Sequence, residues 1–224
     1  QYKVTLTVGM SQKTETVVTS QEAATVLVID ISNSMDDYIC GKKEHTHQWN
    51  CPPWCEKAHT HTSECGGRRL DAAKTAAESF VNTYAGTQEA TGRDLSIVLF
   101  NYYSSVKLDW TDVSTSAGKN RALQAIQNIT LGDYEDGGTN LKGGLSAAGE
   151  KLRETAVADL ARDNKNVIVL TDGAPTQPTW DGGSAGSADL NKQTANEATD
   201  LKKQANIYTI CFGAAGDYTY TGYW

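Results

Sequence analysis

Residues 24–34 read Ala24-Thr-Val-Leu-Val-Ile-Asp30-Ile-Ser32-Asn-Ser34, and this stretch decides the fold class. The run before Asp30 is nearly continuous in β-branched and apolar residues, which is typical of a central strand buried on both faces. Polar residues follow at once, so we expect a tight turn at the end of the strand. Residues 95–100 and 166–171 are two further runs of the same kind.

Segments with helical spacing alternate with these strands. In residues 68–84, apolar side chains recur on one helical face at Leu70, Ala73, Ala77, Phe80, Val81 and Tyr84. Further helices are expected at 114–129, 141–153 and 189–205, a short edge strand at 105–109, and a strand at 207–212. Cys211 in that last strand is expected to be a small buried hydrophobe.

This alternation predicts an α/β fold, with a Rossmann-like, doubly wound, mainly parallel sheet and helices on both faces. In such sheets the ligand site lies at the carboxyl ends of the strands. Residues 21–224 are expected to form this domain, with a small Cys/His insert at 36–67. Residues 2–9 and 13–19 alternate with period two, so residues 1–20 are expected to be leading strands from a preceding stalk module. Gln1 is not an initiator methionine, so we expect the chain to be a piece of a longer protein.

Charge and hydropathy narrow the classes of partner. The 224 residues carry a formal net charge of −7, and no cluster of basic residues is long enough to follow a phosphate backbone, so no nucleic acid is expected as a partner. No apolar stretch is long enough to cross a bilayer, so no membrane insertion is expected in this piece.

Three polar motifs terminate predicted elements and should share one rim of the sheet. They are Asp30-Ile-Ser32-Asn-Ser34, Gly138-Thr139-Asn140 at the start of a helix, and Thr171-Asp172-Gly173 after a buried strand. Each alone could be a turn or a helix cap. Together Asp30, Ser32, Ser34, Thr139 and Asp172 offer hard oxygen ligands, which suit Mg²⁺, Ca²⁺ or Mn²⁺.

Two carboxylates and neutral hydroxyls leave such an ion short of negative charge. We therefore expect an open coordination position that takes a Glu or Asp carboxylate from a protein partner. No nucleophile with a base is visible, so the chain is expected not to be an enzyme.

These motifs, with the helix phrase at 70–80 and the strand phrases at 167–173 and 207–210, resemble the von Willebrand factor A family and its metal-ion-dependent adhesion site. The resemblance covers about residues 24–213 and implies Asp30, Ser32, Ser34 and Thr139 as ligands, with Asp172 binding directly or through water. Asn33 stands where the family usually has Gly. The sequence looks most like adhesins of Gram-positive (Firmicutes) pili and cell walls. That implies an extracellular, cell-surface domain, anchored through parts outside this chain, which binds a host matrix or surface protein.

The Cys/His insert is an internal repeat. Each copy has the order Cys, His-Thr-His, three residues, Cys, and the eight residues are Cys40, His45, His47, Cys51, Cys55, His59, His61 and Cys65. The copies are similar to units in surface proteins of gut Firmicutes. Two thiolates and two imidazoles per copy form the ligand set of a closed Zn²⁺ site. The alternative is two disulfides, Cys40–Cys51 and Cys55–Cys65, which an extracellular setting favours.

Other functions remain in competition with adhesion. The domain could join a surface fibre as a structural module whose ion stabilises the fold. A zinc hydrolase using His-x-His is a remote alternative, because the sulfur ligands help to close the zinc shell to water and no general base is placed nearby. The fold alone also allows an intracellular partner of an ATPase.

Overall fold

The computed structural model describes residues 22–40, 60, 66–86, 92–132, 138–173, 175–176 and 188–212. The predicted leading strands at 1–20 lie outside these ranges. In the described part of the chain, none of the helices combines the length and the apolar character needed to cross a bilayer.

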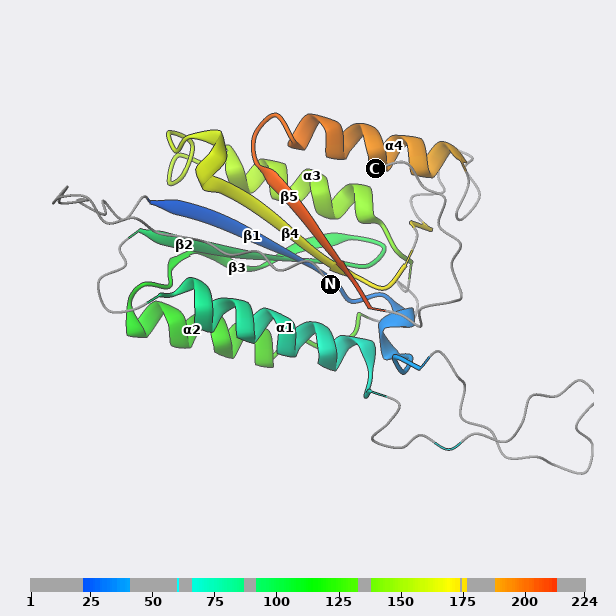
Figure 1. The fold of residues 1–224 in the computed structure, drawn as a ribbon. Helices are drawn as coiled ribbons and strands as arrows, with labels where there is room; N and C mark the ends of the chain where they lie inside the picture. The colour runs from blue at the N-terminus through cyan, green and yellow to red at the C-terminus, as the bar shows by residue number, and fades with distance from the viewer. Residues whose placement is uncertain are drawn as a thin grey trace, which may run out of the picture.

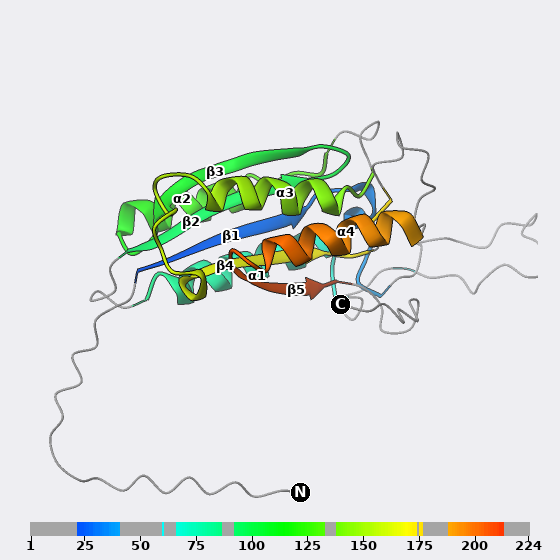
Figure 2. The same ribbon diagram turned by 90° about the horizontal axis from the view of Figure 1, so that it is seen from above.

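A five-stranded sheet forms the centre of the domain, in the order β3-β2-β1-β4-β5 (Figures 1 and 2). The strands are β1 (Ala23–Asp30), β2 (Arg93–Phe100), β3 (Ser104–Asp112), β4 (Lys165–Thr171) and β5 (Asn206–Cys211). All neighbours are parallel except β2 and β3, which pair antiparallel. The predicted mainly parallel sheet is confirmed, with β1 at its centre.

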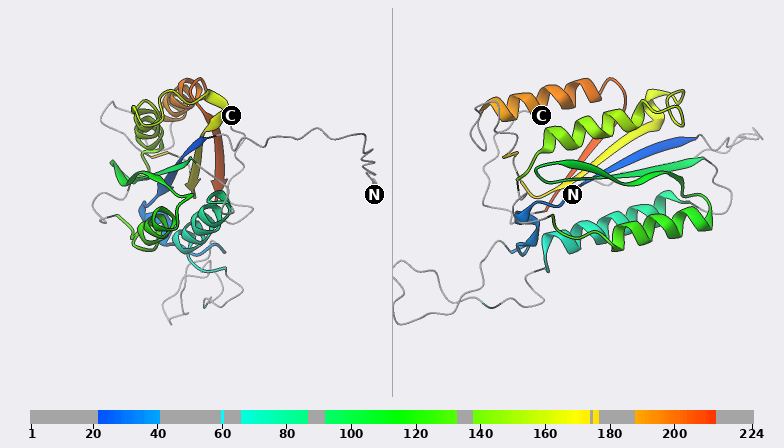
Figure 3. Two further views of the ribbon diagram at one scale, coloured as in Figure 1. Left: turned by 90° about the vertical axis from the view of Figure 1, so that its left-hand side faces the viewer. Right: turned by 180° about the vertical axis from the view of Figure 1, so that it is seen from behind.

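Helices cover both faces of the sheet, as the doubly wound prediction requires. The helices α1 (Arg69–Tyr84) and α2 (Ser116–Gln127) lie on one face, and α3 (Leu141–Leu152) and α4 (Ala188–Leu201) lie on the other (Figure 3, left). In the described part of the chain, two short 3-10 turns complete the elements, η1 (Asn33–Asp36) after β1 and η4 (Arg162–Asn164) before β4.

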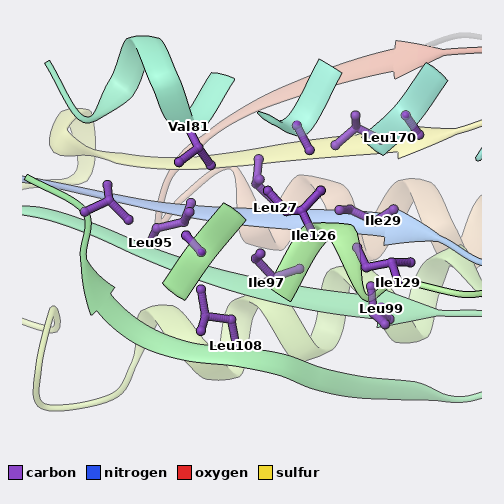
Figure 4. Packing of buried hydrophobic residues seen from close by; sticks show 14 of the residues in the cluster. Leu27, Ile29, Val81, Leu95, Ile97, Leu99, Leu108, Ile126, Ile129 and Leu170 are labelled. Atoms are coloured by element: carbon purple, nitrogen blue, oxygen red, sulfur yellow. The ribbon is translucent and has the colours of Figure 1, made fainter. Parts of the chain in front are cut away.

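Successive residues of β1 enter two separate hydrophobic cores. Leu27 and Ile29 face α1 and α2, whereas Val26 and Val28 face α3 and α4. The side chains of β2 alternate between the same two cores, because β1 and β2 pair in register from Ala23–Arg93 to Asp30–Phe100. Figure 4 shows the first core, in which strand side chains pack against Val81 of α1 and Ile126 of α2. Because both faces of β1 are buried, its carboxyl end is held rigidly.

Gly144 lets α3 approach the sheet closely. A Cβ at this position would lie 3.0 Å from the Phe100 ring and 3.0 Å from Val28 Cγ1, closer than most real contacts. At Gly149 of the same helix a Cβ would meet only Arg153 Nη1, at 3.3 Å, and Leu201 Cδ1, at 3.5 Å. The close packing at Gly144 fixes the start of α3 relative to the ends of β1 and β2.

Gly144→Ala is therefore expected to lower the free energy of unfolding by about 1–3 kcal/mol through overpacking. Gly149→Ala is the control on the same helix and should raise it by up to about 1 kcal/mol, because alanine has the better helix propensity. Urea unfolding of both variants measures the difference. Equal effects of the two substitutions would contradict the close approach at Gly144.

Two details of the prediction need correction. The strand expected at 105–109 is a true edge but runs from Ser104 to Asp112, because its outward polar side chains hide the strand pattern. Cys211 was expected to be buried, and this is wrong: its side chain is exposed, as are those of residues 208–210. The reason is that β5 lies at the edge of the described sheet.

Candidate functional site

Asp30 is the last residue of β1, and its carboxylate is held by two hydrogen bonds. The Ser32 backbone N–H donates to Asp30 Oδ1 over 2.8 Å, and the Thr171 hydroxyl donates to Asp30 Oδ2 over 2.6 Å. Asp30 and Ser32 are both fully buried. The turn after the strand thus folds back on the carboxylate, as the polar residues at this point predict.

Ser34 joins this turn to the end of β4. It lies in η1, where the turn brings its Oγ to 3.2 Å from Ser32 Oγ. Its hydroxyl donates to Asp172 Oδ1 over 2.9 Å, although 138 positions separate the two residues. The structure therefore brings Asp30, Ser32, Ser34 and Asp172 together at the carboxyl ends of two neighbouring parallel strands.

Burial dominates the electrostatics of Asp30. The pKa of the carboxyl is raised from 3.8 to about 6 in total: burial is the largest cause, hydrogen bonds from Ser32 and Thr171 partly offset it, and the negative charge of Asp172 adds a smaller increase. Ionising Asp30 at neutral pH is therefore costly unless a positive charge is close by.

Thr171 was not singled out from the sequence as a site residue, yet it donates the shortest hydrogen bond to Asp30. We expect Thr171→Val to lower the free energy of unfolding at about pH 7.5 by about 1–3 kcal/mol, because a buried ionised carboxylate loses a donor. Thr209→Val on exposed β5 is the matched control and should change little. Chemical denaturation measures both, and an unchanged stability in Thr171→Val would contradict the assigned hydrogen bond.

Arg69 is a second residue that the sequence interpretation missed. It is the first residue of α1, and its side chain is only 9% exposed. Its Nη1 donates to Asp172 Oδ2 over 2.6 Å and to the Ser34 carbonyl over 3.3 Å. Arg69 belongs to none of the sequence motifs, so the sequence gives no sign of this ion pair between residues 103 positions apart.

Thr139 lies at the same end of the sheet, on the loop that leads into α3. Its backbone N–H donates to Thr176 Oγ1 over 2.8 Å, and the Thr176 N–H returns a bond to the Thr139 carbonyl over 3.0 Å. The next residue, Asn140, caps α3 and donates its N–H to the Asn101 carbonyl at the end of β2. Thr139 is buried but is not itself the helix cap.

The base of the Cys/His insert stands beside this site. Tyr38 and Arg68 form an antiparallel bridge, with the Ile39 N–H donating to the Gly67 carbonyl over 3.0 Å. The chain therefore leaves and re-enters the domain between Ser34 and Arg69. Cys40 is described; the other predicted insert ligands, His45, His47, Cys51, Cys55, His59, His61 and Cys65, lie outside the described residues.

The side chains predicted to hold a cation at this end of the sheet offer oxygen atoms as ligands. In the described ranges, no group of three or more His, Cys, Asp or Glu side chains forms a metal-binding cluster. A hard cation at this end of the sheet would thus depend on the two carboxylates and on the hydroxyls of Ser32 and Ser34, with Thr139 on the adjacent loop.

Comparisons with known proteins agree with this architecture. A family model described as von Willebrand factor type A domain matches residues 61–222. The matched range begins after most of the insert, so β1 and its Asp-x-Ser-x-Ser turn precede it. A search of curated proteins found no match.

Two of the solved structures compared share the fold, and a third has a weaker similarity. The PilB minor pilin from Streptococcus sanguinis is 14% identical with a TM-score of 0.58, over 88% of this chain and 51% of that one. Proximal thread matrix protein 1 from the mussel byssus is 16% identical with a TM-score of 0.52, over 86% and 38%. The vWF domain of the type V pili tip protein Mfa5 from Porphyromonas gingivalis is 22% identical with a TM-score of 0.46, over 71% and 40%. The chain thus spans about half or less of these proteins' structures.

Proposed function

Because the chain belongs to the von Willebrand factor type A domain family, we propose that it is a cation-dependent protein-binding domain of a bacterial cell-surface or pilus protein. The observation that carries the proposal is the contact between the two strand ends, in which Ser34 bridges Ser32 and Asp172 beside the buried Asp30. PilB, which shares the fold, is a minor pilin, and the proposal extends an extracellular surface location to this chain.

The residues at this site fit a hard divalent cation. Asp30 is a buried carboxylate whose pKa is raised to about 6, and Asp172 adds a second negative charge close by. Mg²⁺ is the ion that we propose, with Ca²⁺ or Mn²⁺ as substitutes. When bound, the ion supplies a positive charge that attracts a carboxylate of the protein partner.

The chain's own residues perform the positioning. Asp30 is fixed by a strand buried on both faces, and Ser32 is held by its backbone bond to that carboxylate. Ser34 is oriented by its bond to Asp172. Because these oxygens are already close together, little ordering entropy would oppose ion binding.

Binding to an array of matrix proteins and glycans tests the proposal. In Mg²⁺ the wild-type domain should bind a ligand that Asp30→Ala does not, since the substitution removes a central carboxylate. Asp163→Ala is the matched control, because Asp163 is exposed and precedes β4 at the opposite end of the sheet. Equal binding by all three proteins would contradict a cation-dependent interaction. Binding by none, with lower stability of Asp30→Ala in Mg²⁺, would favour a structural module of a surface fibre.

The insert is proposed to contribute to the choice of partner, because it starts from the site. Its base is the bridge between Tyr38 and Arg68, which follows Ser34 and directly precedes Arg69 in the chain. Replacing residues 41–65 by a short Gly-Ser linker should then change ligand preference while leaving cation affinity within about threefold of wild type. The same array and a Mg²⁺ titration measure the two effects. An unchanged ligand preference would remove the insert from recognition.

A further inference from the structure

Arg69 brings a buried positive charge to the proposed cation site. Its side chain is 9% exposed and that of Asp172 is 1% exposed, and the two form an ion pair at 2.6 Å. In the part of the chain that the structure describes, Arg69 Nε is buried and has no hydrogen-bond partner. A guanidinium so enclosed is held chiefly by its charge partner, since one of its donors gains nothing from burial.

The position of Arg69 in α1 strengthens this point. A cation in the first turn of a helix is opposed by the helix macrodipole, which is positive at that end. The macrodipole favours an acidic residue in this turn, and Asp71 is such a residue. Arg69 is therefore placed against local helix preference, and its contacts with Asp172 and the Ser34 carbonyl explain the placement.

We propose that Arg69 competes with the divalent cation for Asp172 and thereby sets both the cation affinity and the charge of the loaded site. This inference rests on the proposed function. Ionised Asp30 and Asp172 with one guanidinium leave a single negative charge, so a divalent ion makes the site net positive. Asp37 lies 3.8 Å from Arg69 but is 56% exposed, and solvent screens its charge.

A net positive site has a consequence for the partner. Without Arg69, the two carboxylates would balance the formal charge of the ion, so the shortage of negative charge expected from the sequence exists only with Arg69 in place. With Arg69 in place, the loaded site retains a positive charge that an acidic side chain can neutralise. Arg69 is thus a positioning and specificity-determining residue, which acts through Asp172 and its own charge.

Isothermal titration calorimetry with MnCl₂ tests this inference on the whole chain. Arg69→Gln should bind Mn²⁺ at least about tenfold more tightly than wild type, because a like charge in a poorly screened site is removed. Arg69→Lys keeps the charge and should stay within about threefold of wild type. Arg68→Gln removes the same charge from the adjacent, exposed residue, whose partner is Asp36, and should change the affinity by less than about threefold.

Each outcome decides between the inference and its alternatives. Equal or weaker Mn²⁺ binding by Arg69→Gln would overturn the inference and leave Arg69 as a residue that only orients Asp172. An equal increase in Arg68→Gln would also overturn it, since net charge alone would then explain the effect. If Arg69→Gln folds only when Mn²⁺ is added, the cation replaces the guanidinium and the inference is supported.

If Arg69→Gln does not fold in either condition, Arg69→Lys decides, and a tenfold loss of affinity there would count against the inference. Titration of Asp30→Ala with MnCl₂ measures the heat of Mn²⁺ binding at any other site on the chain. A wild-type signal equal to that of Asp30→Ala would instead refute the proposed cation site itself.

Discussion

Asp30→Asn is expected to raise the free energy of unfolding of the metal-free protein by about 3 kcal/mol at about pH 7.5. The reason is that burial raises the pKa of Asp30 from 3.8 to about 6, so that its ionised form is disfavoured in the folded state. Asparagine removes the charge and keeps the shape. Its amide oxygen can still accept from the Ser32 N–H, and its amide nitrogen can donate to the Thr171 hydroxyl.

The sign of the pH dependence follows from the raised pKa. Between 3.8 and about 6 the folded state keeps the proton that the unfolded state has lost, so the contribution of Asp30 to stability falls as pH rises through this window. Above about pH 6 the loss levels off as the carboxyl of the folded state becomes fully ionised. In Mg²⁺-free buffer, the stability difference between Asp30→Asn and wild type should therefore grow from about pH 4 to about pH 6 and then stay constant.

Denaturant unfolding of both proteins across this pH range is the measurement. In Mg²⁺ the advantage of Asp30→Asn should shrink, because only wild type gains stability from the ion. Asp163→Asn, on the exposed turn before β4, removes a carboxylate far from Asp30 and is the control. A difference that does not change with pH would contradict the raised pKa of Asp30.

Phe100→Ala should lower the free energy of unfolding by about 3–5 kcal/mol, the cost of a large cavity in a packed core. Phe100 ends β2, is fully buried, and packs against α3 at Gly144. The comparison is Tyr103→Ala three residues later, where the side chain is 61% exposed and the expected change is within about 0.5 kcal/mol. Urea unfolding measures both. A loss below about 1 kcal/mol at Phe100 would show that α3 does not pack as described.

The sheet could be predicted from the sequence because burial on both faces leaves a distinct pattern. The runs ending at Asp30, Phe100 and Thr171 are apolar at consecutive positions, and only strands between two helical layers need that. The polar residues that follow Asp30 and Thr171 then marked the end of the sheet at which the site lies. Parallel pairing brings those two ends together, which the structure confirms for Asp30, Ser34 and Asp172.

Other features depend on tertiary contacts that a single sequence does not encode locally. Arg69 looks like an ordinary polar helix residue, and only the fold reveals that it faces Asp172. Thr171 looked like one more β-branched strand residue, yet its hydroxyl supports Asp30. The apolar neighbours of Cys211 suggested burial, but the strand pattern does not distinguish an edge strand from a central one. The roles of Asp30, Ser32, Ser34, Thr139 and Asp172 as metal ligands stay predictions.

One hard cation is proposed to bind between the turn after β1 and the end of β4. Crystals grown with Mn²⁺ test it most directly, through an anomalous difference map collected at the manganese absorption edge. We expect one strong peak at about 2.0–2.3 Å from the hydroxyl oxygens of Ser32 and Ser34, which is lost in Asp30→Ala. No peak beside these residues, or one that persists in Asp30→Ala, would contradict it.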